Sequence, residues 1–330
     1  MVDGPQNKSM KKILLVNFFG ILLIIILLEF ISNFFKLSGL MGIQKGLVYE
    51  KDETHFLYPD KEGVIFDEKV FTDRYGYRVP TKNFRYKNNN NTFILGDSVT
   101  FGNGVKEENT FVGLMRKKFK DQNFLNSSVP GYQLKDHVKI LKGSTKFENV
   151  NNILYFFTLN DIYGSSNITN LDNKKKDESD YDLKKIQLFN KLNAYLRNKS
   201  YLYMLIKGIG TDPSKRWFLN LEKEYENINS SQIRKQFTSL KKFSESTQSN
   251  LVVIILPYEY QTRNCSKNVL NPQSKIIEIL NTSKINFRDF TNYFCNQKKP
   301  NKNFYKFDPM HLSKNGHMLV FKKLKNEINF

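Results

Sequence analysis

The chain has 330 residues, of which 40 % are hydrophobic and 14 % aromatic, so it can form one large domain or two small ones and is not disordered. Its formal net charge is +19, but the lysines are scattered among Asn, Ile and Phe residues. No basic stripe interleaved with aromatic residues and no nucleic-acid motif is present, so we expect no nucleic-acid partner. Two readings of the charge stay open: solvated lysine-rich faces, or attraction to an anionic envelope glycan or lipid headgroup.

The only two cysteines are Cys265 and Cys295, and neither belongs to a CxxC or Cys/His pattern. The sequence therefore predicts no metal site, and no motif indicates another cofactor. In an exported domain the two cysteines could form a disulfide that closes a loop of about thirty residues. Two separate thiols are equally compatible with the sequence.

An apolar stretch at residues 13–35 follows a short tail at residues 1–12. A helix needs about 20 apolar residues to cross the hydrocarbon of a bilayer, so we expect a transmembrane anchor. Glu29 lies near one end of the stretch, where a carboxylate can reach the interface. A cleaved signal peptide is the alternative, but the stretch is long and no small-x-small cleavage site follows it. Lysines lie on both sides, so charge alone barely decides the orientation.

The remaining chain alternates short apolar segments with helical patterns. After an expected stalk and lead-in at residues 36–91, strands are predicted at 92–95, 123–126, 152–157, 251–256 and 285–290. Helices are predicted at 109–119, 134–141 and 316–328. Apolar strands that alternate with helices indicate an α/β fold, a three-layer sandwich with a mostly parallel sheet covered on both faces.

The segment between the third and fourth predicted strands is longer than one crossover needs. Residues 164–182 are polar, and helical sequence follows to about residue 248. We interpret residues 164–248 as a helical insertion into a domain that spans residues 92–330.

A serine follows the first predicted strand, in the phrase ILGDSVTFGNGV, where Ser98 stands after Gly96 and Asp97. At a strand-to-helix turn of a doubly wound sheet, a serine lies at the carboxyl edge, where ligands bind and backbone N–H groups can face an oxyanion. A GDS triplet alone is also compatible with a tight turn that caps the next helix.

The residues DPMHLS precede the last predicted helix and supply what a serine nucleophile lacks. A hydroxyl becomes reactive when a base removes its proton and an acceptor orients that base. His311 and Asp308 stand three residues apart and suit these two roles. Of the other histidines, His55 and His137 lack such a setting, and His317 is expected on a face of the last helix.

Four motifs in order resemble the SGNH/GDSL hydrolase family. GDSVTFG matches the serine block, Gly131 in NSSVPGY the glycine block, Asn160 in FTLND the asparagine block, and DPMHLS the last block. The resemblance covers residues 72–330, and the lead-in TDRYGYR also resembles membrane-anchored members. The family implies a doubly wound, flavodoxin-like sheet.

The resemblance also implies the site. It assigns a catalytic triad of Ser98, His311 and Asp308, and an oxyanion hole of the backbone N–H groups of Ser98 and Gly131 with the side-chain amide of Asn160. Asp97 is expected to be structural and to hold the turn through backbone hydrogen bonds. The family usually has Gly two residues before the asparagine, where this chain has Thr158.

These observations predict an anchored, extracytoplasmic, single-pass enzyme. We expect a serine esterase or O-acyltransferase that acts on acyl esters, acetyl above all, of a cell-envelope or exported glycan, in contact with envelope polysaccharide machinery. A catalytically silent glycan-binding or assembly module with the same fold is the alternative, which the intact Ser98, Asn160, Asp308 and His311 argue against.

Overall fold

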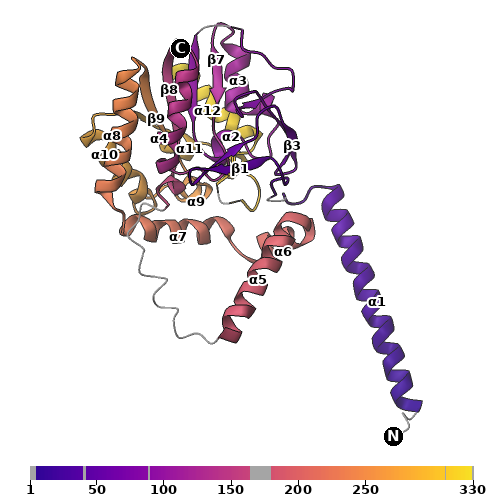
Figure 1. The fold of residues 1–330 in the computed structure, drawn as a ribbon. Coiled ribbons are helices and arrows are strands. Elements are labelled where there is room, and N and C mark those ends of the chain that lie inside the picture. The colour runs from indigo at the N-terminus through magenta and orange to yellow at the C-terminus, as the bar shows by residue number, and fades with distance from the viewer. Residues whose placement is uncertain (1–4, 40–41, 88–89, 164–179, 309, 329–330) are drawn as a thin grey trace.

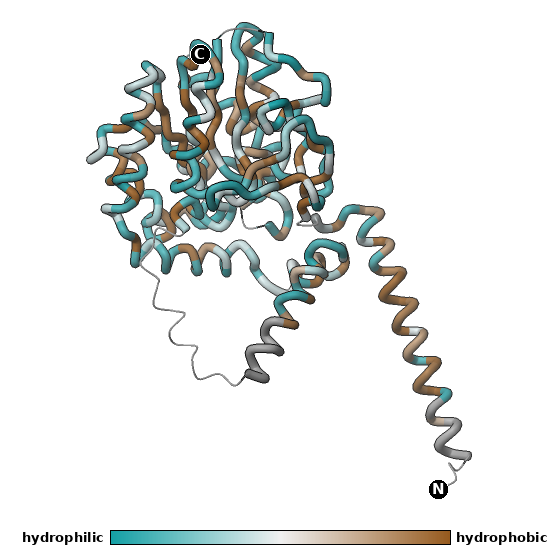
Figure 2. The backbone as a smooth tube through the Cα atoms, viewed as in Figure 1, coloured by the Kyte–Doolittle hydropathy of each residue, from teal (hydrophilic) through white to brown (hydrophobic). Residues whose placement is uncertain are grey.

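The structure is a computed structural model that describes residues 5–39, 42–87, 90–163, 180–308 and 310–328. Helix α1 (Pro5–Phe34) extends away from the remaining elements (Figure 1). Within it, Lys12–Phe34 is long and apolar enough to cross a membrane, and its most apolar window has a mean hydropathy of 2.8 and no buried residue. Figure 2 shows this helix as the longest hydrophobic run of the backbone.

An eight-stranded sheet has the order β10-β9-β8-β6-β7-β5-β4-β3. Its strands are β3 (Glu62–Ile65), β4 (Glu68–Thr72), β5 (Arg78–Val79), β6 (Asn91–Leu95), β7 (Asn123–Asn126), β8 (Val150–Thr158), β9 (Asn250–Leu256) and β10 (Asn286–Asp289). From β10 to β7 all neighbours are parallel. The parallel part of the sheet begins with β6. From there the chain adds β7 on one side of β6, and then β8, β9 and β10 on the other side. The predicted doubly wound, mostly parallel sheet is therefore confirmed.

Helices cover both faces of the parallel strands. Tyr155 and Phe157 on β8 contact α4 and α8 through His137 and Phe237, whereas Phe156 between them contacts Phe111 of α3. Because successive side chains of a strand point to opposite faces, α4 and α8 lie on one face and α3, packed on α12, on the other. The predicted three layers and the buried apolar strands between them are confirmed.

The helices of the described residues after α1 are short to medium in length. They are α2 (Ser98–Phe101), α3 (Phe111–Lys118), α4 (Leu134–Leu141), α5 (Asp180–Lys199), α6 (Tyr201–Gly210), α7 (Pro213–Glu226), α8 (Ser230–Ser246), α9 (Glu259–Asn264), α10 (Asn271–Thr282), α11 (Thr291–Cys295) and α12 (Lys314–Glu327).

The expected boundary at residue 92 differs from the structure. The sequence predicts a stalk and lead-in at residues 36–91, but β3, β4 and β5 within this range extend the sheet as antiparallel strands, joined to it through the pairing of β5 with β7. Strands β1 (Val48–Lys51) and β2 (Thr54–Leu57) form a separate hairpin. These strands are two to five residues long and carry many charged residues, so they lack the apolar runs that identify buried strands.

The helical insertion is also shorter than expected. Helix α8 packs on β9 and α4, so it is the crossover helix of its layer and not part of an insertion. The inserted helices are α5, α6 and α7, which we call the cap. Residues 164–179 of the predicted insertion lie outside the described residues.

Cys265 and Cys295 form a disulfide across a sequence separation of 30 residues. It joins the end of α9 to the end of α11, so of the two possibilities that the sequence left open the structure contains the disulfide.

Candidate active site

A pocket lies at the carboxyl edge of the sheet, under the cap. Its volume is about 450 Å³, and Ser98, Gly131, Asn160 and His311 are among its lining residues. Ser98 follows β6 and Asn160 follows β8, the two neighbouring strands from which the chain winds in opposite directions. This topological switch point is where doubly wound sheets bind ligands.

Ser98 is the first residue of α2, in a turn that is packed too closely for other residues. A Cβ on Gly96 would lie 2.1 Å from Oγ1 of Thr100. The carboxylate of Asp97 caps the helix and accepts a hydrogen bond of 2.9 Å from the backbone N–H of Val99. The expected structural role of Asp97 in the turn is therefore confirmed.

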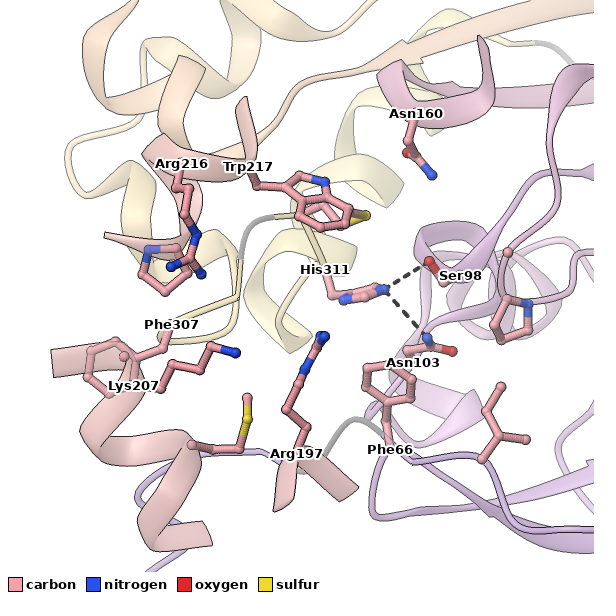
Figure 3. A pocket seen from close by; sticks show the side chains of 17 residues that line it. Phe66, Ser98, Asn103, Asn160, Arg197, Lys207, Arg216, Trp217, Phe307 and His311 are labelled. Atoms are coloured by element: carbon pink, nitrogen blue, oxygen red, sulfur yellow. Dashed lines mark hydrogen bonds between the residues drawn. The ribbon is translucent and has the colours of Figure 1, made fainter. Parts of the chain in front are cut away.

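Ser98, His311 and Asp308 form one chain of hydrogen bonds, shown in part in Figure 3. Nε2 of His311 lies 2.8 Å from Oγ of Ser98, and Nδ1 lies 2.8 Å from Oδ2 of Asp308. A carboxylate only accepts, so Nδ1 carries the proton and Nε2 offers its lone pair to the hydroxyl. Oδ2 of Asp97 lies 3.5 Å from the same hydroxyl, so His311 is the better placed base.

The buried pair of Asp308 and His311 favours the charged forms of both groups. Burial alone would raise the pKa of Asp308, but the charge of His311 and hydrogen bonds from the His311 side chain and backbone lower it below its usual value. Burial would lower the pKa of His311, but the Asp308 carboxylate outweighs it and raises this pKa above its usual value. Asp308 is thus suited to stabilise an imidazolium during proton transfer.

Asn160 is held rigidly at the end of β8. Its Nδ2 donates a hydrogen bond of 3.2 Å to Asp97, and its Oδ1 accepts one of 2.7 Å from the hydroxyl of Tyr258. The carboxylate on one side fixes which end of the amide is nitrogen. Figure 3 shows that nitrogen on the side of Ser98.

Gly131 and its neighbours present a second N–H group. Gly131 has a φ of +91°, a conformation that residues with a Cβ rarely adopt. Nε2 of His55 lies 2.7 Å from the carbonyl oxygen of Pro130. That carbonyl and the N–H of Gly131 belong to one peptide group, so His55, on β2, fixes the plane of the N–H. No sequence pattern indicates this role of His55, because only the hairpin β1–β2 brings its ring to Pro130.

Arg78 on β5 fixes the loop after the serine helix. Its guanidinium is buried and donates hydrogen bonds to the carbonyl oxygens of Phe101, Gly102 and Val105. The lead-in TDRYGYR, which had no assigned role, thus supports the loop that follows the Ser98 helix.

Thr158 occupies the position where the family has glycine. Its hydroxyl lies 2.9 to 3.0 Å from oxygens of Asp97, Asn160 and Asp161. Burial and the charge of Asp97 raise the pKa of Asp161 well above its usual value, which favours the neutral form of Asp161. The threonine therefore fills a polar network behind Asn160 and does not line the pocket.

The cap adds residues that sequence analysis did not single out. Arg197, Lys207, Arg216 and Trp217 line the pocket opposite Ser98, and no Asp or Glu is among the lining residues in the described part of the chain. Burial and the charges of Arg197 and Arg216 lower the pKa of Lys207, so these cations lie close together. Asn103, whose Nδ2 lies 3.4 Å from Nε2 of His311, was missed too, although it directly follows the serine motif GDSVTFG.

No protein-family model and no curated protein matches the chain. Among solved structures, it is similar to the psychrotrophic esterase EstA from Pseudoalteromonas sp. (13 % identity, TM-score 0.43, over 72 % of this chain and 95 % of that one). It is also similar to the acetyl xylan esterase AlAXEase (12 % identity, TM-score 0.44, over 72 % of this chain and 100 % of that one). A third similar structure is that of a lipolytic protein of the G-D-S-L family from Veillonella parvula (14 % identity, TM-score 0.41, over 72 % of this chain and 97 % of that one). The function proposed below rests on the side chains around Ser98.

We predict that His311 titrates above the ordinary histidine value of 6.5, because its folded pKa is raised by Asp308. The contribution of the His311–Asp308 ion pair to the free energy of unfolding is complete below pH 6.5, and it is lost as the pH rises through the pKa of His311 in the folded state. In Asp308→Asn the titration should move to lower pH. Histidine-selective NMR of the full chain in detergent micelles measures both.

His317 is the internal control for this measurement. Burial lowers its pKa to about 3, so it should not titrate between pH 5 and pH 9. A His311 signal that titrates at or below 6.5, or that does not move in Asp308→Asn, would contradict the assigned pairing.

Proposed function

We propose that this chain is a membrane-anchored serine hydrolase or acyltransferase that acts on acyl esters. The observation that carries the proposal is the chain of hydrogen bonds from Ser98 through His311 to Asp308, with 2.8 Å at each step. Asn160 and Gly131 border the same pocket, on the side where a bound carbonyl would develop negative charge. A binding module has no need of this arrangement.

In this proposal each residue of the site has a separate role in the reaction. Nε2 of His311 takes the proton of Ser98 as its oxygen attacks the ester carbonyl, and Asp308 stabilises the imidazolium. The N–H groups of Ser98, Gly131 and Asn160 stabilise the oxyanion, and His311 then protonates the departing alcohol. The acyl-enzyme that remains is resolved by water or by a second hydroxyl, which gives hydrolysis or transfer.

We place the domain outside the cytoplasm, anchored by α1. The disulfide Cys265–Cys295 supports an oxidising compartment. Glu29 of α1 accepts hydrogen bonds from the hydroxyl of Ser200 and the backbone N–H groups of Tyr201 and Leu202. A helix that contacts the folded domain in this way is suited to remain as an anchor, whereas a signal peptide is removed.

We propose an acylated, above all acetylated, envelope glycan as the substrate. Trp217 offers a ring for contact with a sugar, and the cations of the cap suit an acidic saccharide. The cap covers the carboxyl edge of the sheet and shields the acyl-enzyme from part of the water, which favours transfer to a sugar hydroxyl.

The test of the reaction is the loss of the nucleophile. Ser98→Ala and His311→Ala should each lower hydrolysis of 4-nitrophenyl acetate by about 10⁴-fold or more, because the triad acts as a unit. A fluorophosphonate probe should label the unmodified protein and not Ser98→Ala. Labelling that persists in Ser98→Ala, or near-normal rates in either variant, would remove the residue from the mechanism.

The same proteins decide between hydrolysis and transfer. An acetyl donor and envelope oligosaccharides are incubated with the unmodified chain, and the sugars are analysed by mass spectrometry. Acetylated sugar indicates transfer, whereas free acetate and de-esterified glycan alone indicate an esterase. Ser98→Ala is the matched control, because it keeps the pocket and lacks the nucleophile.

Asn160→Ala should lower kcat by about 10²-fold to 10³-fold, because one preorganised oxyanion donor is lost. KM for the small ester should change far less, since the donor acts mainly in the transition state. Thermal melting is measured in parallel. A loss of activity that tracks a fall in melting temperature would show that Asn160 only supports the fold.

Topology is tested with fusions. Alkaline phosphatase placed after Phe330 should be active and green fluorescent protein at the same place dark, because the domain lies outside the cytoplasm. Green fluorescent protein placed before Met1 should be bright and serves as the control. The reverse pattern would contradict the proposed topology and the envelope substrate with it.

A further inference from the structure

Helices α5 and α6 expose an unusual set of apolar side chains. In the described part of the chain beyond residue 35, every large apolar side chain that is more than half exposed belongs to these two helices. The six residues are Leu188, Phe189, Leu192, Tyr195, Ile206 and Ile209. Soluble surfaces rarely gather so many in one place, so this apolar set marks an interaction surface.

The spacing and charge of the segment are those of an interfacial helix. Leu188, Leu192 and Tyr195 follow the i, i+4, i+7 pattern and therefore share one face of α5. Between Asp182 and Asp212 the sequence contains no acidic residue and six basic ones. The basic residues are Lys184, Lys185, Lys191, Arg197, Lys199 and Lys207. Apolar faces flanked by Lys and Arg without acids fit a bilayer with anionic headgroups.

Helix α6 is joined to α1 near the end of the apolar span. The carboxylate of Glu29 accepts hydrogen bonds of 2.7 and 3.1 Å from the N–H groups of Tyr201 and Leu202, and one of 2.5 Å from Ser200. These N–H groups belong to the first turn of α6, where backbone donors lack helical partners. Ser38, just beyond α1, donates to the carbonyl oxygen of Tyr201 at 2.7 Å. Glu29 is therefore occupied by α6 and does not have to reach water.

This junction sets the depth of α6. Glu29 lies five residues before Phe34, the last residue of the apolar span. At 1.5 Å per residue the start of α6 lies about 7 to 8 Å below the end of the span. Interfacial helices bury their apolar face about 5 to 10 Å into the boundary between headgroups and acyl chains. Figure 1 shows α5 on the side of the domain from which α1 leaves.

We propose that α5 and α6 form a second membrane contact, which inserts its apolar set into the outer surface of the bilayer that α1 crosses. The occupant of this surface is lipid, and the inference rests on the proposed anchoring by α1. The same two helices supply Arg197, Met204 and Lys207 to the pocket of Ser98. The pocket therefore opens at the headgroup layer, and its substrates are presented by the membrane.

The test uses the full chain in nanodiscs of phosphatidylcholine and phosphatidylglycerol. Phe189→Cys and Ile206→Cys are each labelled with an environment-sensitive fluorophore, which reacts selectively because Cys265 and Cys295 are already joined. Lipids that carry a nitroxide on the acyl chain should reduce the emission of both labels by about half or more. Both substitutions are at exposed positions, so the fold should be retained.

Two matched variants make the result decisive. Ser246 is exposed at the end of α8, just before β9, and therefore lies at the edge of the sheet opposite the pocket. A fluorophore on Ser246→Cys should not be quenched. Ile24→Cys within α1 should be quenched. Quenching at Ile24 without quenching at Phe189 and Ile206 overturns the second contact and leaves the anchor intact. No quenching at Ile24 overturns the anchor itself.

A second copy of the chain is the competing occupant. It would shift the emission of the Phe189 label to shorter wavelength without quenching by the lipid nitroxide, and only when a nanodisc holds two copies. That result would also overturn the proposal. Quenching in nanodiscs that hold a single copy supports lipid as the occupant.

Discussion

The carboxylate of Asp97 joins the two strand ends that carry the candidate chemistry. One oxygen accepts the N–H of Val99 and so shapes the turn that exposes Ser98; the other accepts the amide of Asn160 at the end of β8. Asp97 is completely buried, and hydrogen bonds in a buried site are stronger than in water and tolerate little displacement. The relative position of Ser98 and Asn160 is thereby set by one side chain.

The sequence was most informative where local pattern and chemistry coincide. Strands β6, β8 and β9 each contain a short uninterrupted apolar run, and Ser98, Asn160 and the pair Asp308 and His311 follow or precede regular elements. Residues at such ends converge whenever strands are parallel, so the order of the motifs was enough to predict the neighbourhood. The hydrogen bond between His311 and Asp308 required only three residues of separation in one loop.

The rest could not be predicted, because it depends on contacts between distant segments. Arg78 and His55 lie in short strands without an apolar run, and their roles arise because β5 extends the sheet and the β1–β2 hairpin lies beside Gly131. From the sequence, Glu29 is predicted to reach the membrane interface, because no local pattern shows that the backbone N–H groups of Tyr201 and Leu202 need an acceptor. The cap and α8 are likewise predicted as one long insertion, because no sequence pattern shows that α8 packs on β9.

Attachment at two places changes what the pocket encounters. A single transmembrane helix leaves a domain free to rotate and tilt above the bilayer, whereas the proposed second contact through α5 and α6 would fix which face points to the headgroups. A site that is confined with its substrate meets it at an effective concentration set by geometry, in the millimolar range for short tethers. A lipid-linked or membrane-adjacent glycan then competes with water for the acyl-enzyme far better than a glycan in solution would. Under the proposed membrane attachment, the orientation of the pocket, more than any residue beside Ser98, would be the physical basis on which transfer can exceed hydrolysis.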